Sequence, residues 1–297
     1  MPPDALSRTS MATVFRVTAI HADTFYARQA AAEALAELEG IENRLSRFVE
    51  GSDVRQINRL RPGEAALVTQ DTFDCLRIAL DVQSGTRGAF DVTYASAAAT
   101  RHLPPSPLAG EGSGVRGQLG QITHLLLGGR LELDEGSHRV RLLADGVRVD
   151  LGGIGKGFAL DRMAAILREW DIESALLSAS TSTHLALGPP PGQPGWPVRF
   201  GPDADPRHAL LSGSALSASG KGEKGNHIID PRTGRPAQRA FRAWAAAPTA
   251  AVADALSTAF MVMDQEEIRA FCREHPQVAA HVLQQESGPM YSVQSGA

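Results

Sequence analysis

The sequence predicts an α+β fold in which mixed and antiparallel sheets pack with helices. Short segments of alternating apolar residues, typical of strands, interleave with longer segments whose apolar residues recur at helical spacing. Three strand segments, at 122–127, 130–133 and 139–143, are separated only by Gly-Gly and Glu-Gly turns, which indicates an antiparallel meander. The sequence has no internal repeat and no clean boundary, so we expect one domain over residues 11–297.

The other elements follow from the same periodicities in chain order. A strand at 12–20 precedes an amphipathic helix at 26–47, whose leucines fall on one face. Ser52 and Asp53 can cap a short helix that follows. We expect further helices at 71–83, at 158–170 and from about 253, and strands near 66–68, 175–177, 185–187 and 198–200.

Composition excludes several classes of function. The 297 residues carry a net charge of −4, with a pI near 6.1 and only 5% aromatic residues. Because the basic residues are scattered and aromatic residues are sparse, we expect no nucleic-acid partner. The two cysteines, Cys75 and Cys272, fit no metal-binding spacing and do not indicate a disulfide scaffold.

Two segments are expected to lie outside the packed domain. Residues 1–10 lack the apolar stretch of a secretory signal and read as a disordered extension. Residues 101–118 are rich in Pro, Gly and Ser and predict a flexible insert. No apolar run reaches the length of a membrane span, so we expect no membrane segment and a cytoplasmic location.

A glycine-rich turn at 150–161 is the first stretch that suggests chemistry. Four glycines and Lys156 lie between a short strand and the helix expected at 158–170. Glycine allows close backbone approach, and the N–H groups of a first helical turn favour an anion such as phosphate. Because Gly157 follows the lysine, neither the Walker pattern nor G-x-G-x-x-G fits. A tight turn with a solvated lysine is the alternative.

Two further motifs carry polar groups that suit a phosphate or metal site. In the stretch 227–234, His227 and Asp230 precede a turn, where a histidine can act as a base or bond a phosphate. Bracing of that turn is the alternative for both residues. Asp254 and Thr258 are four apart near a helix start, so their oxygens share one side and suit Mg²⁺. A helix cap is the alternative.

Together these motifs resemble one family, the FAD:protein FMN transferases or ApbE-type flavin transferases, once called thiamine biosynthesis lipoproteins. The resemblance runs from Met11 nearly to the C-terminus. The segments that carry it, in order, are 11–13, 45–48, Ser52, Asn58, 88–93, 149–157, Trp196, 227–234 and 250–261.

The resemblance implies an ApbE-like, T-fold-like architecture and a specific reaction. Such enzymes bind FAD, use Mg²⁺ at its diphosphate and move FMN onto a Ser or Thr hydroxyl of an acceptor flavoprotein, releasing AMP. The implied metal ligands are Asp254, Thr258 and a backbone carbonyl, that of Gly153 in preference to that of Gly155. The implied catalytic residues are His227 and Asp230. The implied FAD site comprises Met11, Phe48, Ala89, Phe90, Asp91, Asp150, Lys156, His227 and Ile228.

The chain also departs from the family pattern. A usual Gly-Gly-Asp or Gly-Gly-Asn is replaced at 178–181, and the aromatic residue of a Thr-Ser-Gly-Asp-Tyr segment is missing at 218–222. Phe48 stands where a tyrosine is usual, which keeps the ring and loses the hydroxyl. Two alternatives to protein flavinylation therefore stay open. One is Mg²⁺-dependent hydrolysis of FAD to FMN and AMP, and the other is flavin binding without turnover.

Overall fold

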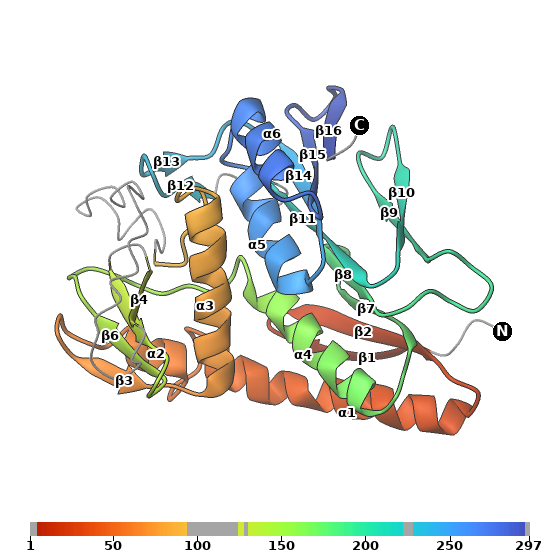
Figure 1. Ribbon diagram of the computed structural model, residues 1–297, viewed down its shortest axis with the longest axis horizontal. Helices are drawn as coiled ribbons and strands as arrows, with labels where there is room; N and C mark the ends of the chain where they lie inside the picture. Colours follow the sequence, from red (N-terminus) through yellow and green to blue (C-terminus); the bar gives the residue numbers. More distant parts are fainter. Residues whose placement is uncertain (1–4, 94–123, 128–129, 222–227, 295–297) are drawn as a thin grey trace. The chain divides into compact units, whose positions relative to one another are not determined.

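The computed structural model describes residues 5–93, 124–127, 130–221 and 228–294 (Figure 1). The chain forms two compact units, each assembled from separate stretches of sequence. Unit 1 comprises Met1–Ile41, Ile154–Lys221 and Gln238–Ala297, and unit 2 comprises Glu42–Gly153 and Gly222–Ala237. The α+β class is confirmed by mostly antiparallel sheets and six helices among the described residues. The single domain stays a prediction, and the predicted insert at 101–118 lies outside the described residues.

Unit 1 is built on an eight-stranded sheet in which every neighbouring pair of strands is antiparallel. Its order is β1-β2-β7-β8-β11-β14-β15-β16, so strands distant in sequence pair at the centre. The strands are β1 (Leu6–Ser10), β2 (Thr13–Ile20), β7 (Ser174–Ala179), β8 (Thr183–Ala186), β11 (Ser214–Gly220), β14 (Arg242–Ala247), β15 (Ala279–Leu283) and β16 (Met290–Gln294).

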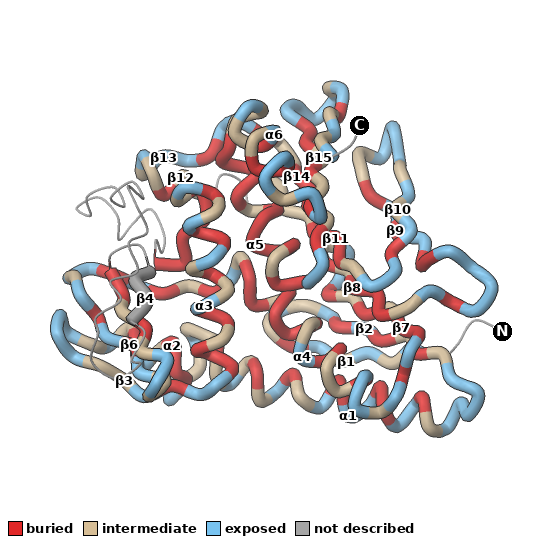
Figure 2. Tube along the Cα trace, viewed as in Figure 1, coloured by how far each residue is buried: buried red, intermediate tan, exposed pale blue. Residues whose placement is uncertain are grey.

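Helices cover one face of this sheet. Helix α5 (Ala250–Phe260) packs on β11 and β14 and lies beside α4 (Gly155–Glu169), as Figure 1 shows. Nearly all of α5 is buried (Figure 2). Helix α6 (Gln265–Glu274) follows, and α1 (Thr24–Leu45) begins in unit 1. Because it is packed closely against both the sheet and α4, α5 is a rigid support for the polar side chains that it carries.

The opposite face of the sheet is covered by a hairpin of β9 (Trp196–Phe200) and β10 (Arg207–Leu211). Successive side chains of a strand point to opposite faces, so Leu216 and Trp244 face this hairpin while their neighbours face α5. The apolar cluster on this side comprises Ala186, Trp196, Val198, Phe200, Leu211, Leu216, Trp244, Leu283 and Met290.

Unit 2 contains a four-stranded antiparallel sheet in the order β3-β6-β5-β4. The predicted meander is therefore confirmed. The strands are β3 (Ala65–Leu67), β4 (His124–Leu127), β5 (Leu131–Asp134) and β6 (Arg139–Leu142), with the helices α2 (Asp53–Ile57) and α3 (Gln70–Gly85). A small hairpin, β12 (Ile229–Asp230) and β13 (Arg235–Pro236), completes the unit.

The expectation of disorder at 1–10 is wrong for Leu6–Ser10, which form β1. This strand pairs with β2 from Leu6 opposite Val17 to Ser10 opposite Thr13. The two residues between the strands, Met11 and Ala12, have φ angles of 51° and 56°, as a tight hairpin turn requires. Main-chain hydrogen bonds hold this edge strand, so its low apolar content did not predict its order.

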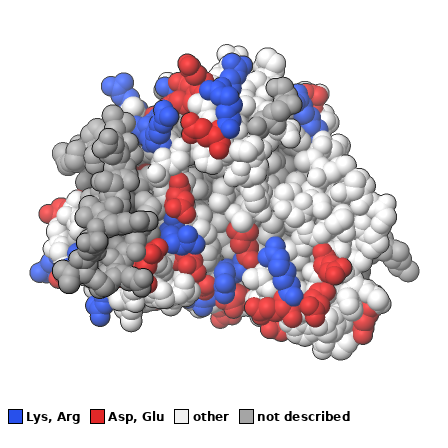
Figure 3. Space-filling view, viewed as in Figure 1, with Lys and Arg blue, Asp and Glu red and all other residues white. Residues whose placement is uncertain are grey.

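Two observations describe the helices and the charged surface of the described residues. Among the described residues, no helix combines the length and the apolar character needed to cross a membrane. On the face drawn in Figure 3, Lys and Arg side chains are interspersed with Asp and Glu side chains. A continuous basic surface of the kind that binds nucleic acid is therefore not seen among the described residues of that face.

Candidate functional site

The predicted chemistry of unit 1 gathers where the N-terminal ends of α4 and α5 meet. The glycine-rich turn leads into α4, which begins at Gly155 rather than near Phe158 as expected. A Cβ atom at Gly157 would collide with the carbonyl oxygen of Ala250. Glycine is therefore needed here for close helix packing, which brings the start of α4 against the first turn of α5.

The Asp254 carboxylate lies at this junction and is almost fully buried. The Gly157 N–H donates to its Oδ2 at 3.1 Å, and the Ser217 hydroxyl donates to its Oδ1 at 3.2 Å. The Lys156 ammonium lies 3.3 Å from each carboxylate oxygen. A buried carboxylate needs such compensation. The structure thus brings together Lys156 and Asp254, which are 98 positions apart in sequence.

A row of hydroxyl groups continues from this carboxylate along α5 and β11. Thr258 donates to the Asp254 carbonyl oxygen at 3.3 Å. The Ser219 hydroxyl lies 3.2 Å from that of Thr258 and 2.8 Å from that of Ser257. Ser217 and Ser219 lie on one face of β11, and they contact Asp254 and Thr258 respectively. The side chains of Asp254 and Thr258 therefore both face β11. The sequence interpretation assigned no role to either serine and predicted no strand here, although their alternate spacing was a usable signal.

These oxygens fit a hard divalent cation. Mg²⁺ prefers carboxylate, hydroxyl and carbonyl oxygens and keeps several waters. A cationic group, the Lys156 ammonium, already lies against both Asp254 oxygens, and its side chain is 26% exposed. Among the described residues, no group of three His, Cys, Asp or Glu side chains could hold a metal. The predicted ligand set does not need such a group, because it has one carboxylate and otherwise neutral oxygens. Gly153 belongs to unit 2, and its role as a metal ligand stays a prediction.

A second carboxylate, that of the partly buried Asp161 on α4, fixes the start of α5. Its two oxygens accept the N–H groups of Ala250 and Ala251, both at 2.8 Å. Burial raises the pKa of Asp161 to about 6, while the two backbone N–H groups and Arg168 oppose that shift. This residue was seen in the sequence only as the end of the glycine-rich motif.

In unit 2, the structure places the predicted flavin residue Asp91 in a closed polar cluster. Its Oδ1 accepts the N–H and the hydroxyl of Thr93, at 2.8 and 2.6 Å. Its Oδ2 accepts a hydrogen bond from Arg130 at 3.0 Å, and both side chains of this pair are buried. Ala89 and Phe90 are also buried. Contact of these three residues with FAD stays a prediction.

Phe48 and Asp150 are linked through Arg47, also within unit 2. The Arg47 guanidinium lies 4.6 Å from the centre of the Phe48 ring, and its Nε lies 3.4 Å from Asp150 Oδ2. The Phe48 side chain is exposed, whereas Asp150 Oδ1 accepts the Gly152 N–H at 3.0 Å. Asn58 holds the segment before Asp150 by two bonds to the Val149 backbone. An exposed ring with an adjacent cation suits stacking on a planar ligand.

The remaining predicted residues are placed as follows. Asp230 accepts hydrogen bonds from the backbone and guanidinium of Arg232, so it braces its own turn, and a catalytic role stays a prediction. The carbonyl of Ile228 accepts the N–H of Ala237. Met11 lies at the tip of the β1–β2 hairpin. His227 lies outside the described residues.

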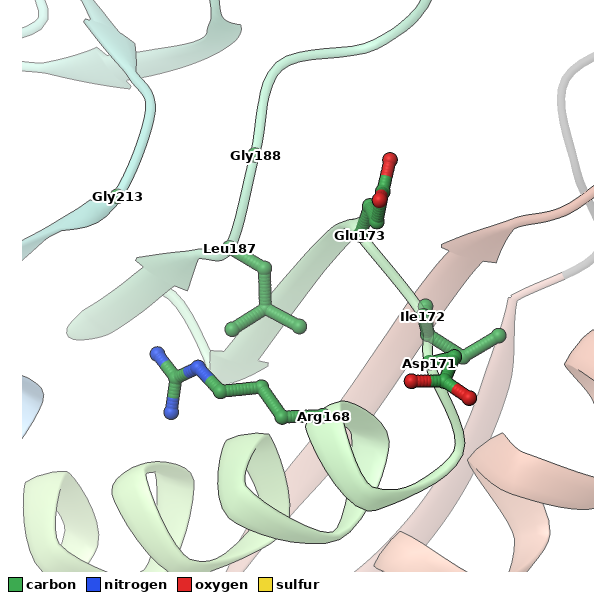
Figure 4. Close-up of a pocket in the computed structure, with 7 residues that line it drawn as sticks. All are labelled: Arg168, Asp171, Ile172, Glu173, Leu187, Gly188 and Gly213. Atoms are coloured by element: carbon green, nitrogen blue, oxygen red, sulfur yellow. The ribbon is translucent and has the colours of Figure 1, made fainter.

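A surface cavity of about 460 Å³ lies at the C-terminal end of α4 (Figure 4). It contains none of the predicted site residues, and Lys156 is at the opposite end of the same helix. Figure 4 shows the Arg168 side chain extending beneath Leu187, whereas Glu173 points away. Its lining residues are Arg168, Asp171, Ile172, Glu173, Leu187, Gly188 and Gly213.

Comparison with known proteins identifies the family. The FAD:protein FMN transferase of Klebsiella pneumoniae is 25% identical over 291 residues, which cover 91% of this chain and 81% of that protein. The flavin transferase ApbE of Vibrio cholerae shares the fold, with a TM-score of 0.77 and 22% identity. The ApbE protein of Thermotoga maritima is 27% identical with a TM-score of 0.75; both alignments cover 98% of this chain and 97% of the other. The sequence profile of the ApbE family matches residues 11–282, and the chain therefore belongs to that family.

Proposed function

We propose that this chain transfers FMN from FAD to a Ser or Thr hydroxyl of an acceptor flavoprotein, with Mg²⁺ at the diphosphate and AMP as the product. The relatives described above that are named FAD:protein FMN transferase or flavin transferase support this activity. The single observation that supports it most directly is the Lys156 ammonium against both oxygens of the buried Asp254 carboxylate. A metal–diphosphate site requires a carboxylate whose oxygens can contact a cation, and both oxygens of Asp254 already contact one.

The metal would be held by Asp254, Thr258 and the Gly153 carbonyl. When bound, Mg²⁺ neutralises charge on the diphosphate oxygens and so favours displacement at phosphorus. The Gly157 N–H and the Ser217 hydroxyl hold the Asp254 carboxylate in a fixed orientation for this task. The Lys156 ammonium adds a second positive charge beside the same carboxylate.

In the proposed reaction, the acceptor hydroxyl oxygen attacks the phosphorus atom on the FMN side of the FAD diphosphate. The new phosphorus–oxygen ester bond forms while the bond to the bridging oxygen breaks, and AMP leaves with that oxygen and its electron pair. The hydroxyl proton passes to a base, for which His227 is the proposed group, with Asp230 as the second catalytic candidate. Most of the acceleration would come from positioning and charge neutralisation, as is general for phosphoryl transfer.

The proposed FAD-binding residues are described unit by unit. Unit 1 contributes Met11 and Lys156 to this set, and the members that belong to unit 2 are Phe48, Ala89, Phe90, Asp91, Asp150, His227 and Ile228. The exposed Phe48 ring, with Arg47 beside it, is the proposed stacking surface for the isoalloxazine. The acceptor is a flavoprotein with an accessible Ser or Thr; a cytoplasmic location for the reaction stays a prediction.

One assay separates this function from its alternatives. The purified chain is incubated with FAD, MgCl₂ and a candidate acceptor flavoprotein, and covalent FMN on the acceptor and free AMP are measured together. Equal amounts of covalent FMN and AMP are expected. AMP and FMN without label on protein would instead indicate FAD hydrolysis, and FAD retained without AMP would indicate a binding protein. An acceptor whose target hydroxyl is replaced, with Ser→Ala or Thr→Val, is the matched control.

A further inference from the structure

The start of α5 has an unusually complete set of hydrogen bonds. The first four N–H groups of a helix have no partner within it. Here the Thr249 hydroxyl accepts the N–H of Val252 at 3.4 Å, and the Asp161 carboxylate accepts the N–H groups of Ala250 and Ala251. The N–H of Ala253 already makes the first regular helical bond, to the Thr249 carbonyl at 3.1 Å. The first turn is thus capped once by its own N-cap residue and twice by a different helix.

Asp161 and Gly157 are four residues apart on α4, so they lie on the same face of that helix. This face meets the first turn of α5 at three points. Gly157 packs against the carbonyl oxygen of Ala250, its N–H binds the Asp254 carboxylate, and Asp161 binds the two N–H groups. Since Asp254 is one turn beyond Ala250, any sliding of α5 along α4 moves its carboxylate relative to Gly157 and Lys156.

Even a partly buried carboxylate loses hydration at this place, and a local cap from Thr249 is already present. The charge is favoured there by the positive end of α5 and by two hydrogen bonds, which a neutral side chain could not both supply. What distinguishes Asp161 is that it joins α4 to α5, whereas Thr249 caps only its own helix.

We propose that Asp161 is a positioning residue that, by holding the first turn of α5 against α4, sets the Asp254 carboxylate at the distance where Gly157 and a bound cation both reach it. The expected effect of Asp161 on cation binding rests on the proposed function. The expected effect of Asp161 on the position of Asp254 does not, because the hydrogen bond from Gly157 to Asp254 exists in the protein without metal.

The decisive variant is Asp161→Asn, which keeps the size but replaces one acceptor oxygen with an NH₂ group that faces a backbone N–H. In metal-free protein, amide hydrogen exchange of Gly157 is measured by NMR, and its protection is expected to fall by about tenfold or more. In parallel, binding of MnCl₂ is followed by electron paramagnetic resonance, and its Kd is expected to rise by about 10- to 100-fold. If this variant does not fold, Asp161→Ser is measured in the same way.

Two matched controls distinguish positioning from plain helix stabilisation. Thr249→Ala removes a cap from the same helix without touching α4. Asp264→Asn removes an equivalent cap from α6, where the Asp264 carboxylate accepts the N–H groups of Glu266 and Glu267 at 3.0 and 2.9 Å. Both controls should lower Tm yet leave Gly157 protection and the Mn²⁺ Kd within about twofold of wild type.

The outcomes separate this inference from the proposed function. Unchanged Gly157 protection in Asp161→Asn, or an equal loss in Thr249→Ala, would overturn the positioning role whatever the metal does. Failure of wild-type protein to bind Mn²⁺ would instead count against the metal site, and the exchange measurement would still decide the role of Asp161.

Discussion

Two buried carboxylates, Asp254 in unit 1 and Asp91 in unit 2, are each paired with one basic side chain, but the two pairs differ in how they are closed. The Asp91–Arg130 pair is sealed: its side chains are 0% and 6% exposed, and Thr93 supplies two further donors. In the Asp254–Lys156 pair, the carboxylate is 2% exposed and the lysine 26%, and the ammonium lies 3.3 Å from both oxygens.

The difference indicates which pair can exchange its cation. Arginine presents a planar array of donors that suits a fixed partner, whereas a lysine ammonium is a compact charge on a flexible stem. Because Lys156 is partly exposed and its contacts with Asp254 are long, we expect that a metal ion could take the place of the ammonium beside the carboxylate. Asp91 offers no such access among its described contacts. Changes at the closed pair should therefore affect folding, and changes at the open pair should affect turnover.

Replacement of Asp254 should have the largest effect. Asp254→Asn removes the charge that would hold the metal while keeping an acceptor for Gly157, so Mg²⁺-dependent release of AMP from FAD should fall by roughly 100- to 1,000-fold. AMP release is measured across a MgCl₂ titration, with Asp254→Ala as the more severe change. Undiminished activity in either variant would reject the metal assignment.

Breaking the closed pair should cost stability instead. Arg130→Met leaves the Asp91 carboxylate buried without its cation, so the free energy of unfolding should fall by about 3–5 kcal/mol. Urea unfolding followed by circular dichroism measures this loss. The matched control is Arg141→Met, which breaks the more exposed Arg141–Glu132 pair between β6 and β5 of the same unit and should change stability by less than about 1 kcal/mol. Equal losses of unfolding free energy in the two variants would mean that the buried Asp91–Arg130 pair stabilises the fold no more than the exposed pair does.

A third carboxyl group, that of the partly buried Asp161, has backbone N–H groups where the other two have a basic side chain, and this difference predicts a pH effect. Burial raises its pKa from 3.8 to about 6, so between these values the folded state holds more protons than the unfolded state. Stability from this group is therefore greatest at low pH and falls as pH rises from about 4 to about 6. The fall should approach about 3 kcal/mol, at about 1.4 kcal/mol per pKa unit.

This pH effect is measured as the difference in unfolding free energy between wild type and Asp161→Asn. A difference is needed because burial and the charge of Arg207 lower the pKa of His281 to about 4, which gives a slope of the opposite sign below pH 6.5. His281 is present in both proteins, so its contribution cancels. A difference that does not change between pH 4 and pH 6 would mean that Asp161 stays ionised throughout.

The sequence could predict what depends on local periodicity. The α+β class, the meander of unit 2 and the shared orientation of Asp254 and Thr258 all follow from strand or helix spacing. The start of α5 was expected near residue 253 but lies at Ala250, because the carboxylate that binds its first N–H groups comes from α4. A partner 89 positions away leaves no local signal.

The same limit applies to the two carboxylate pairs. Asp91 lies in a motif that resembles a flavin site, yet Arg130, its partner, is 39 positions away and beyond the insert. Ser217 and Ser219 face the site only because β11 lies beside β14, which carries the chain to α5. Residue type and spacing therefore indicated the kind of chemistry, whereas the pairing of side chains depended on sheet order.

Replacement of the lysine in the open pair should give the smallest effect and the sharpest comparison. Lys156→Met removes a cation that competes for Asp254, so MgCl₂ should raise the Tm of the variant more than that of wild type. Turnover should nevertheless fall by about tenfold, because one charge beside the diphosphate is lost. Both are measured on the same preparations, by thermal unfolding and by AMP release. Arg130→Met is the control, since Mg²⁺ should not restore its Tm. If Mg²⁺ stabilises Lys156→Met no more than wild type, the ammonium does not occupy the place of a metal, and the two pairs differ only in exposure.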